Sequence, residues 1–150
     1  MSHLHLHIAA EHTSLAAQQQ PTSMPVGWQT ALASCKQPAL PTAAALELAI
    51  MQVEDAISAN WPQRLLLATV SSSDPAIYQI ATLSGLAAEH GSQLGRHSVE
   101  GLFSRLANAV EGGSAAGLPD GAEFIGSLLI LRELLHHLDI AAITLVSPAT

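Results

Sequence analysis

Polar and apolar side chains alternate with a strict period of two at the start of the chain. Three histidines take one set of positions over residues 3–8, and leucine or isoleucine takes the other. This period is typical of a β-strand with one buried face and one polar face. We therefore expect an antiparallel pair of short strands over 2–8 and 13–17. The tight turn between them, residues 9–12, is where we expect a functional loop.

Further along the chain, apolar residues recur at helical spacing in several segments and form short runs in others. The predicted elements are a helix over 43–59, a strand over 64–70, helices over 75–88, 98–110 and 121–138, and a strand over 142–146. The run 64–70 is continuously apolar, which is typical of a strand buried on both faces and predicts helices flanking the sheet. This order of elements predicts a single α/β domain over 1–150, with a mixed sheet.

Two segments are predicted to be less regular. Residues 18–41 contain four prolines and a run of three glutamines, and we expect an irregular stretch with a short third strand over 28–32. Residues 90–96 are expected to form a loop. Polar residues at the predicted helix starts are interpreted as caps; these are Thr42, Asp74 before Pro75, Ser98, and the capping box Asp120 to Glu123.

The composition narrows the function. Charged residues make up 11% of the 150 residues and apolar residues 49%, whereas about 25% charged is usual. A surface so poor in charge predicts coverage by a protein partner, most simply a second copy in a homo-oligomer. The net charge of −7 provides no electrostatic footprint for nucleic acid or anionic lipid.

The single cysteine, Cys35, rules out an intrachain disulfide and a thiolate metal cage, and a reducing cytoplasm is the expected location. No basic leader precedes an apolar run. No apolar stretch approaches the roughly 18 residues of a membrane span. We therefore expect no association with a membrane.

The histidines are the first candidates for chemistry, since the chain has eight of them. Along a strand, neighbouring His-x-His residues stand about 6.6–7 Å apart and can share one ion, but His3 and His7 stand about 13 Å apart and cannot. A divalent metal at His5 and His7 would therefore need a further ligand. The candidates are Glu11, His12, Glu133, His136 and His137. We favour the interpretation that the strand histidines face solvent, and the metal site remains the alternative.

Two further histidines end the last predicted helix. His136 and His137 are neighbours about 100° apart around the helix axis, and we expect them to interact with the negative end of the helix dipole rather than with a metal. Glu133 can pair with His137 at the i,i+4 spacing. Glu54 is among the acids to which the sequence assigns no role.

Ser71 to Ser73 lie between a predicted strand and a predicted helix, where open α/β sheets bind ligands and where a helix N-terminus can hold a phosphate. No glycine is present to let the backbone approach a phosphate closely, so simple capping is the favoured interpretation and an anion site the alternative. The sequence has no Gly-x-Ser-x-Gly elbow for a serine nucleophile.

Three phrases, His7 to Ser14, Ala68 to Ser73 and Gly121 to Val146, resemble the carboxy-terminal part of the core of the exopolyphosphatase and guanosine-pentaphosphate phosphohydrolase family. This family belongs to the actin and Hsp70-like ATPase superfamily. The resemblance implies a single ribonuclease-H-like lobe in which the first two phrases take the places of phosphate loops. The polar positions that the resemblance preserves, together with the adjacent Ser72, are candidate phosphate ligands: Thr13, Ser14, Thr69, Ser71 and Ser72.

The departures from the family pattern point away from catalysis. His7 takes the place of the family's aspartate, and Ala9, Ala10 and Glu11 take the places of its glycines, where side chains would obstruct a bound phosphate. The half that would carry the other wall of the cleft has no counterpart in the chain. We therefore expect a non-catalytic relative that acts by association with a protein partner or with itself. The alternative is a phosphate- or metal-dependent phosphohydrolase that uses the remaining loop residues and histidines.

Overall fold

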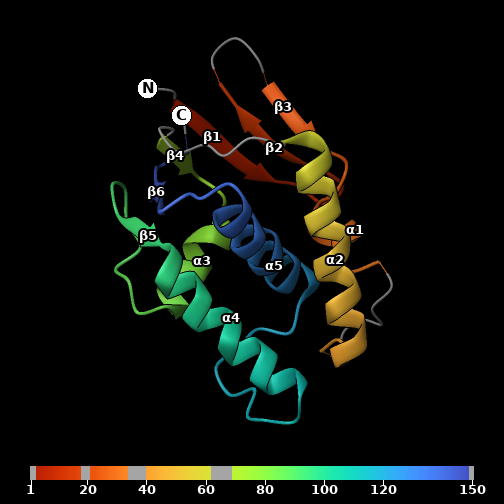
Figure 1. Cartoon of the computed structure of the whole chain (residues 1–150). Coiled ribbons are helices and arrows are strands. Elements are labelled where there is room, and N and C mark those ends of the chain that lie inside the picture. The colour runs from red at the N-terminus through yellow and green to blue at the C-terminus, as the bar shows by residue number, and fades with distance from the viewer. Residues whose placement is uncertain (1–2, 18–20, 34–39, 62–68, 149–150) are drawn as a thin grey trace.

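The computed structural model describes residues 3–17, 21–33, 40–61 and 69–148, and it confirms the predicted α/β fold. Within these residues, six strands form one mixed sheet and helices pack against it (Figure 1). The strands are β1 (His3–Ile8), β2 (Thr13–Ala16), β3 (Pro21–Met24), β4 (Thr69–Ser72), β5 (Gln93–Gly95) and β6 (Ala142–Leu145). The helices are α1 (Trp28–Ala31), α2 (Ala43–Asn60), α3 (Pro75–Leu83), α4 (Arg96–Val110) and α5 (Ala122–His137).

The strand order in the sheet is β3-β2-β1-β4-β6-β5. β1, β4 and β6 run parallel to one another, whereas β2, β3 and β5 run antiparallel to their neighbours. β1 and β2 form the predicted hairpin, in which His7 lies opposite Ser14. The Ala9 N–H donates to the His12 carbonyl at 2.8 Å and closes the turn.

The helix layer lies on one face of the sheet. The chain moves from β1 to β4 and from β4 to β6 in the same direction across the sheet, and because parallel crossovers are almost always right-handed, their helices share a face. α5 lies at the centre of this layer, in contact with α1, α2, α3 and α4 (Figure 1). Side chains are buried nearly all around α5, which explains its broad apolar pattern.

The two faces of the sheet differ in burial. Leu6, Leu15 and Ile143 point toward the helices and are at most 1% exposed. We call the other side the histidine face. One row of it, aligned by the strand registers, consists of Ala16, His5, Ser71, Thr144 and Gln93. Most of these side chains are half-buried or exposed, and Ser71 is the buried one. Thr69, at the start of β4, is exposed. The prediction that this strand is buried on both faces is therefore wrong at Thr69.

The segment predicted to be irregular contains two regular elements. The strand predicted over 28–32 is wrong, because the N–H groups of Trp28, Gln29 and Thr30 bond to carbonyls of the loop after β1 and begin helix α1. The third strand is instead β3, at the edge of the sheet, where Pro21 is tolerated. Residues 18–20 and 34–39 of this segment lie outside the described residues.

Several boundaries also differ from the prediction. Residues 64–68 of the predicted strand over 64–70 lie outside the described residues. The described strand β4 begins at Thr69 and includes Ser71 and Ser72, which were expected in a loop. Part of the predicted loop 90–96 is strand β5, which pairs with β6 but is only three residues long, too short to show a period.

The predicted helix caps are confirmed at one position and fail at others. The Thr42 side chain accepts a hydrogen bond from the Ala45 N–H at 3.1 Å, as expected. Ser98 lies inside α4, which begins at Arg96, and the capping box at Asp120 is wrong because Gly121 is the N-cap residue without a side-chain cap. No helix in the described part of the chain combines the length and the apolar character needed to cross a membrane.

Candidate functional site

On the histidine face, the Ser71 side chain of β4 contacts two histidine rings of β1. The Ser71 Oγ lies 3.1 Å from His3 Nε2 and 3.4 Å from His5 Nδ1. Ser71 is only 2% exposed, with the two imidazole rings against its hydroxyl. A predicted phosphate ligand therefore already has two polar neighbours from the protein.

Asp74, which follows β4, connects the third histidine to the end of β1. Its Oδ1 lies 2.6 Å from His7 Nδ1, and its Oδ2 accepts a hydrogen bond from the Ile8 N–H at 2.7 Å. Its own N–H donates to Ser72 Oγ at 3.2 Å. Asp74 occupies the N-cap position of α3, but its side chain makes no cap bond, so the interpretation of Asp74 as a side-chain cap is wrong.

The position of Asp74 is the one where open α/β sheets usually bind ligands. β1 connects to β2 on one side, whereas the chain after β4 continues toward β6 on the other side. The carboxyl ends of β1 and β4 therefore form the topological switch point of the sheet. Asp74 is 8% exposed there, and its carboxylate adds a negative charge where a phosphate would have to bind.

The loop over 9–12 presents carbonyl groups to α1. The Ala9 carbonyl accepts from Trp28 N–H at 3.0 Å, and the Ala10 carbonyl accepts from the N–H groups of Gln29 and Thr30 at 2.9 and 3.2 Å. These are the donors that the N-terminus of a helix leaves unsatisfied. A Cβ on Gly27 would lie 2.0 Å from the Ala9 oxygen, so this approach requires glycine.

The remaining predicted site residues lie in different surroundings. Thr13 is fully buried, and its Oγ1 donates to the Val26 carbonyl at 2.8 Å. Ser14 is half-buried on the histidine face, and His12 is exposed in the loop. His5, His7 and His12 are not among the groups of described side chains that place three metal-ligating atoms within 4.8 Å of one another.

A pocket lies beside the loop after β4. It has a volume of about 450 Å³ and is lined by Ser73, Pro75, Tyr78, Glu89, His90, Ser147 and Pro148. His90 Nδ1 accepts a hydrogen bond from the Ser147 N–H at 2.9 Å. No residue of the loop over 9–12 lines this pocket, so the two predicted phosphate loops do not face each other across it.

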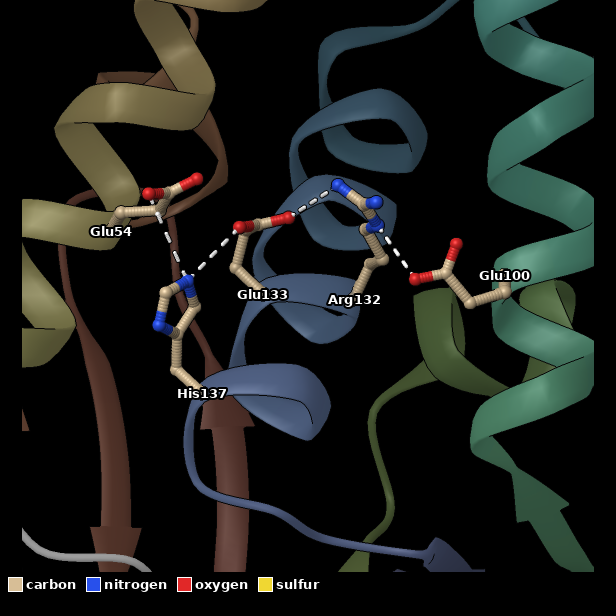
Figure 2. A network of polar contacts seen from close by, with 5 residues as sticks. All are labelled: Glu54, Glu100, Arg132, Glu133 and His137. Atoms are coloured by element: carbon tan, nitrogen blue, oxygen red, sulfur yellow. Dashed lines mark hydrogen bonds and ion pairs between the residues drawn. The ribbon is translucent and has the colours of Figure 1, made fainter.

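A second polar cluster crosses the helix layer from α4 to α2 (Figure 2). In this cluster, Arg132 Nε donates to Glu100 at 2.9 Å, and Arg132 NH1 donates to Glu133 Oε2 at 2.8 Å. His137 Nε2 lies 3.4 Å from Glu133 Oε1 and 3.9 Å from Glu54 Oε2. The guanidinium of Arg132 also lies over the ring of Phe103, 4.4 Å from its centre.

The charges of this cluster act on one another. Burial raises the pKa of the Glu133 carboxyl above its usual range; Arg132 opposes this shift, and Glu54 adds to it. Burial alone would lower the pKa of Arg132, but hydrogen bonds and charges from Glu100 and Glu133 together raise it. Arg132 therefore remains a cation that orients both carboxylates.

Sequence reasoning found part of this cluster. The spacing of Glu133 and His137 predicted their contact, and the structure confirms it. Glu54 had no assigned role, because the packing of α2 on α5 brings it beside His137, which lies 83 positions later in the chain. Helical spacing identifies neighbours within one helix, but it does not identify the partner helix.

Comparison with families and curated proteins found no family model and no curated protein that matches the chain. Solved structures do match. The PPX-GPPA enzyme of Aquifex aeolicus superposes with a TM-score of 0.72 at 10% identity, over 98% of this chain and 54% of the enzyme. An exopolyphosphatase-like protein superposes with a TM-score of 0.73 at 13% identity, over 98% of this chain and 55% of that protein.

An exopolyphosphatase from Cytophaga hutchinsonii is similar to a lesser degree, with a TM-score of 0.59 at 13% identity over 97% of this chain and 53% of the enzyme. The chain thus spans about half the length of the structures that it matches. At these identities the likeness concerns the fold. The chain has the ribonuclease-H-like fold of one lobe of these exopolyphosphatase-type proteins.

Proposed function

We propose that this chain acts by associating with a protein surface, most simply that of a second copy, and that it does not hydrolyse phosphate compounds. The observation that carries the proposal is the carboxylate of Asp74 at the switch point between β1 and β4, bonded to His7 and to the Ile8 N–H. Lobes of this fold bind ligands at the carboxyl ends of such strands. In this chain, a protein side chain already occupies that position.

The electrostatics at this position oppose a bound phosphate. The Asp74 carboxylate would repel an anion. The N–H groups at the start of α1 are already bonded to the carbonyls of Ala9 and Ala10, so they are not available to bind one. The Ile8 N–H, which could have donated to a phosphate oxygen, donates to Asp74 instead. The net charge of −7 adds a general repulsion.

The association surface that we propose is the outer face of α2. Leu48 and Met51 are 53% and 59% exposed and are the exposed large apolar side chains of the described residues. Ala44, one turn before Leu48, is exposed as well, and the spacing 44, 48, 51 places all three on one side of the helix. A helix face of this kind is complementary to the same face of a second copy related by a two-fold axis.

Analytical ultracentrifugation with the wild type and the double variant Leu48→Lys, Met51→Lys tests this surface. The wild type is expected to form dimers, and the variant to have a dissociation constant at least tenfold higher, because a charge in an apolar interface loses its hydration. The matched control is Ser104→Lys with Asn108→Lys, which introduces two lysines one turn apart at exposed polar positions of another helix, α4. Wild type that remains monomeric at the highest soluble concentration, or a control as disruptive as the double variant, would contradict self-association through α2.

A second assay tests the absence of hydrolysis. Purified wild type is expected to release no phosphate from polyphosphate or from a generic phosphate ester, with or without Mg²⁺ or Zn²⁺. Release that is reduced by the variant His5→Gln, His7→Gln would support the phosphohydrolase alternative and contradict the proposal. The circular dichroism spectrum of this double variant is compared with that of the wild type, so that a loss of activity through unfolding is recognised.

A further inference from the structure

The three groups at the α2 side of the polar cluster in Figure 2 are all metal-ligating side chains. Glu54 comes from α2, and Glu133 and His137 come from consecutive turns of α5. One donor atom from each lies within 4.8 Å of the other two. Among the residues that the structure describes, no other three metal-ligating side chains lie this close together.

We infer that Glu54, Glu133 and His137 bind a divalent transition-metal cation of the Zn²⁺ class and that this ion links α2 to α5. The inference is independent of the association surface proposed above. It assigns two carboxylate oxygens and one imidazole nitrogen as ligands, a donor set suited to zinc.

The donor spacing is close to that of a tetrahedral site. Ligand atoms about 2.0–2.1 Å from a tetrahedral ion lie roughly 3.4 Å from one another. His137 Nε2 lies 3.4 Å from Glu133 Oε1 and 3.9 Å from Glu54 Oε2. The Glu54 side chain is 41% exposed, so it has room to rotate and bring its oxygen closer to an ion.

The charge balance of the cluster provides a second observation. The cluster contains three carboxylates, those of Glu54, Glu100 and Glu133, and one guanidinium, that of Arg132, which pairs with Glu100 and Glu133. With a neutral imidazole, two negative charges are uncompensated, and one of the three carboxylates belongs to a side chain only 2% exposed. A divalent cation between Glu54 and Glu133 would compensate both charges.

The surroundings of Glu133 resemble those of an oriented metal ligand. Its Oε2 accepts from Arg132, which leaves Oε1 directed at His137 (Figure 2). Such outer partners fix the orientation of a ligand before the ion binds. His137 is 30% exposed, so an ion can enter from solvent and retain water in its fourth position.

Zinc titration of chelator-treated full-length protein tests the site. The wild type is expected to bind one Zn²⁺ by calorimetry and, at a free concentration 100-fold above Kd, to gain roughly 5–10 °C in Tm. The variants Glu54→Gln and His137→Gln are each expected to weaken binding at least tenfold. Both side chains are partly exposed, so these changes leave the core intact. Mg²⁺ is expected to bind far more weakly, because it prefers oxygen ligands in octahedral geometry.

Two controls separate this site from other histidines. His136→Gln removes the neighbouring exposed ring, and the variant His5→Gln, His7→Gln removes the histidines of β1; both are expected to retain zinc binding within about twofold, as expected for sites that do not share ligands. In the nitrogen spectrum of the histidine rings, zinc is expected to shift His137. Binding that persists in the Glu54→Gln, His137→Gln double variant, or no binding by the wild type at millimolar zinc, would overturn the inference.

Discussion

The carboxylate of Asp74 accepts a hydrogen bond of 2.7 Å from the backbone N–H of Ile8. The two residues lie 66 positions apart in the chain, beyond the last paired residues of β1 and β4, His5 and Ser71. The carboxylate therefore extends the contact between two parallel strands after their ladder has ended. It also satisfies a backbone N–H that is buried and would otherwise lack a partner.

Replacement of Asp74 tests the importance of this contact. Asp74→Ala is expected to lower the free energy of unfolding by about 2–3 kcal/mol, because the buried Ile8 N–H loses its acceptor. Asp74→Asn retains an oxygen at the same place and is expected to cost only about 1 kcal/mol. Urea unfolding measures both values, and equal losses in the two variants would show that the acceptor oxygen is not what matters.

Two glycines are predicted to be required where α1 meets its neighbours. A Cβ on Gly126 of α5 would lie 2.2 Å from the Trp28 oxygen, and a Cβ on Gly27 would lie 2.0 Å from the Ala9 oxygen. In both cases the obstructing atom belongs to the backbone and cannot rotate away. Gly27→Ala and Gly126→Ala are each expected to lower the free energy of unfolding by about 2–3 kcal/mol through overpacking.

Gly101 is the matched control for these two positions. It lies inside α4, and a Cβ there would meet no atom within 4 Å. Gly101→Ala is expected to raise the free energy of unfolding by about 0.5–1 kcal/mol, because alanine has less backbone freedom to lose in a helix. Denaturant unfolding of the three variants compares them directly. A stabilising Gly126→Ala would contradict the close packing of α1 against α5.

The elements with a strong local period were predictable. The alternation over 3–8 predicted β1 and its hairpin, and the apolar stripe around Leu102 and Leu106 predicted α4. α1 was not predictable, because its first N–H groups are satisfied by the loop carbonyls of Ala9 and Ala10. A segment of four residues held by such distant contacts carries no periodic signal of its own.

The candidate site was predictable only in outline. The expected phosphate loops do lie at neighbouring strand ends, but the role of Asp74 depends on the pairing of β1 with β4. An aspartate before a proline has the local appearance of a helix cap. In the folded chain its carboxylate instead bonds to Ile8 and His7 and makes no cap bond. Likewise, Glu54 acquires its neighbours only when α2 packs on α5.

The buried hydroxyl of Thr13 is predicted to serve the fold rather than a ligand. Thr13→Val is expected to lower the free energy of unfolding by about 1–2 kcal/mol, because the bond to the Val26 carbonyl is lost, and Thr13→Ser is expected to retain that bond. Ser14→Ala, at a half-buried position, is expected to change stability by less than about 0.5 kcal/mol. Thermal unfolding with and without phosphate checks the alternative role: a phosphate-dependent rise in Tm that Thr13→Val or Ser14→Ala abolishes would show that these hydroxyls bind the anion.

The raised pKa of Glu133 predicts how stability depends on pH when no metal is present. A carboxyl whose pKa rises on folding holds its proton more tightly in the folded chain. Its contribution is fully present below the unfolded value of 4.5 and is lost as the pH rises through the higher folded value. In the presence of a chelator, the wild type is therefore expected to lose stability relative to Glu133→Gln as the pH rises above 4.5.

Urea unfolding of both proteins at a series of pH values measures this difference. Glutamine retains an oxygen for the hydrogen bond with Arg132 but cannot ionise, so the comparison isolates the cost of the buried charge. Glu123→Gln, an exposed acid in the first turn of the same helix, controls for the loss of a negative charge from α5. If the difference between wild type and Glu133→Gln stays constant or shrinks as the pH rises, then Arg132 and His137 compensate the Glu133 carboxylate fully. The uncompensated charge that favours a cation beside Glu54 would then be absent.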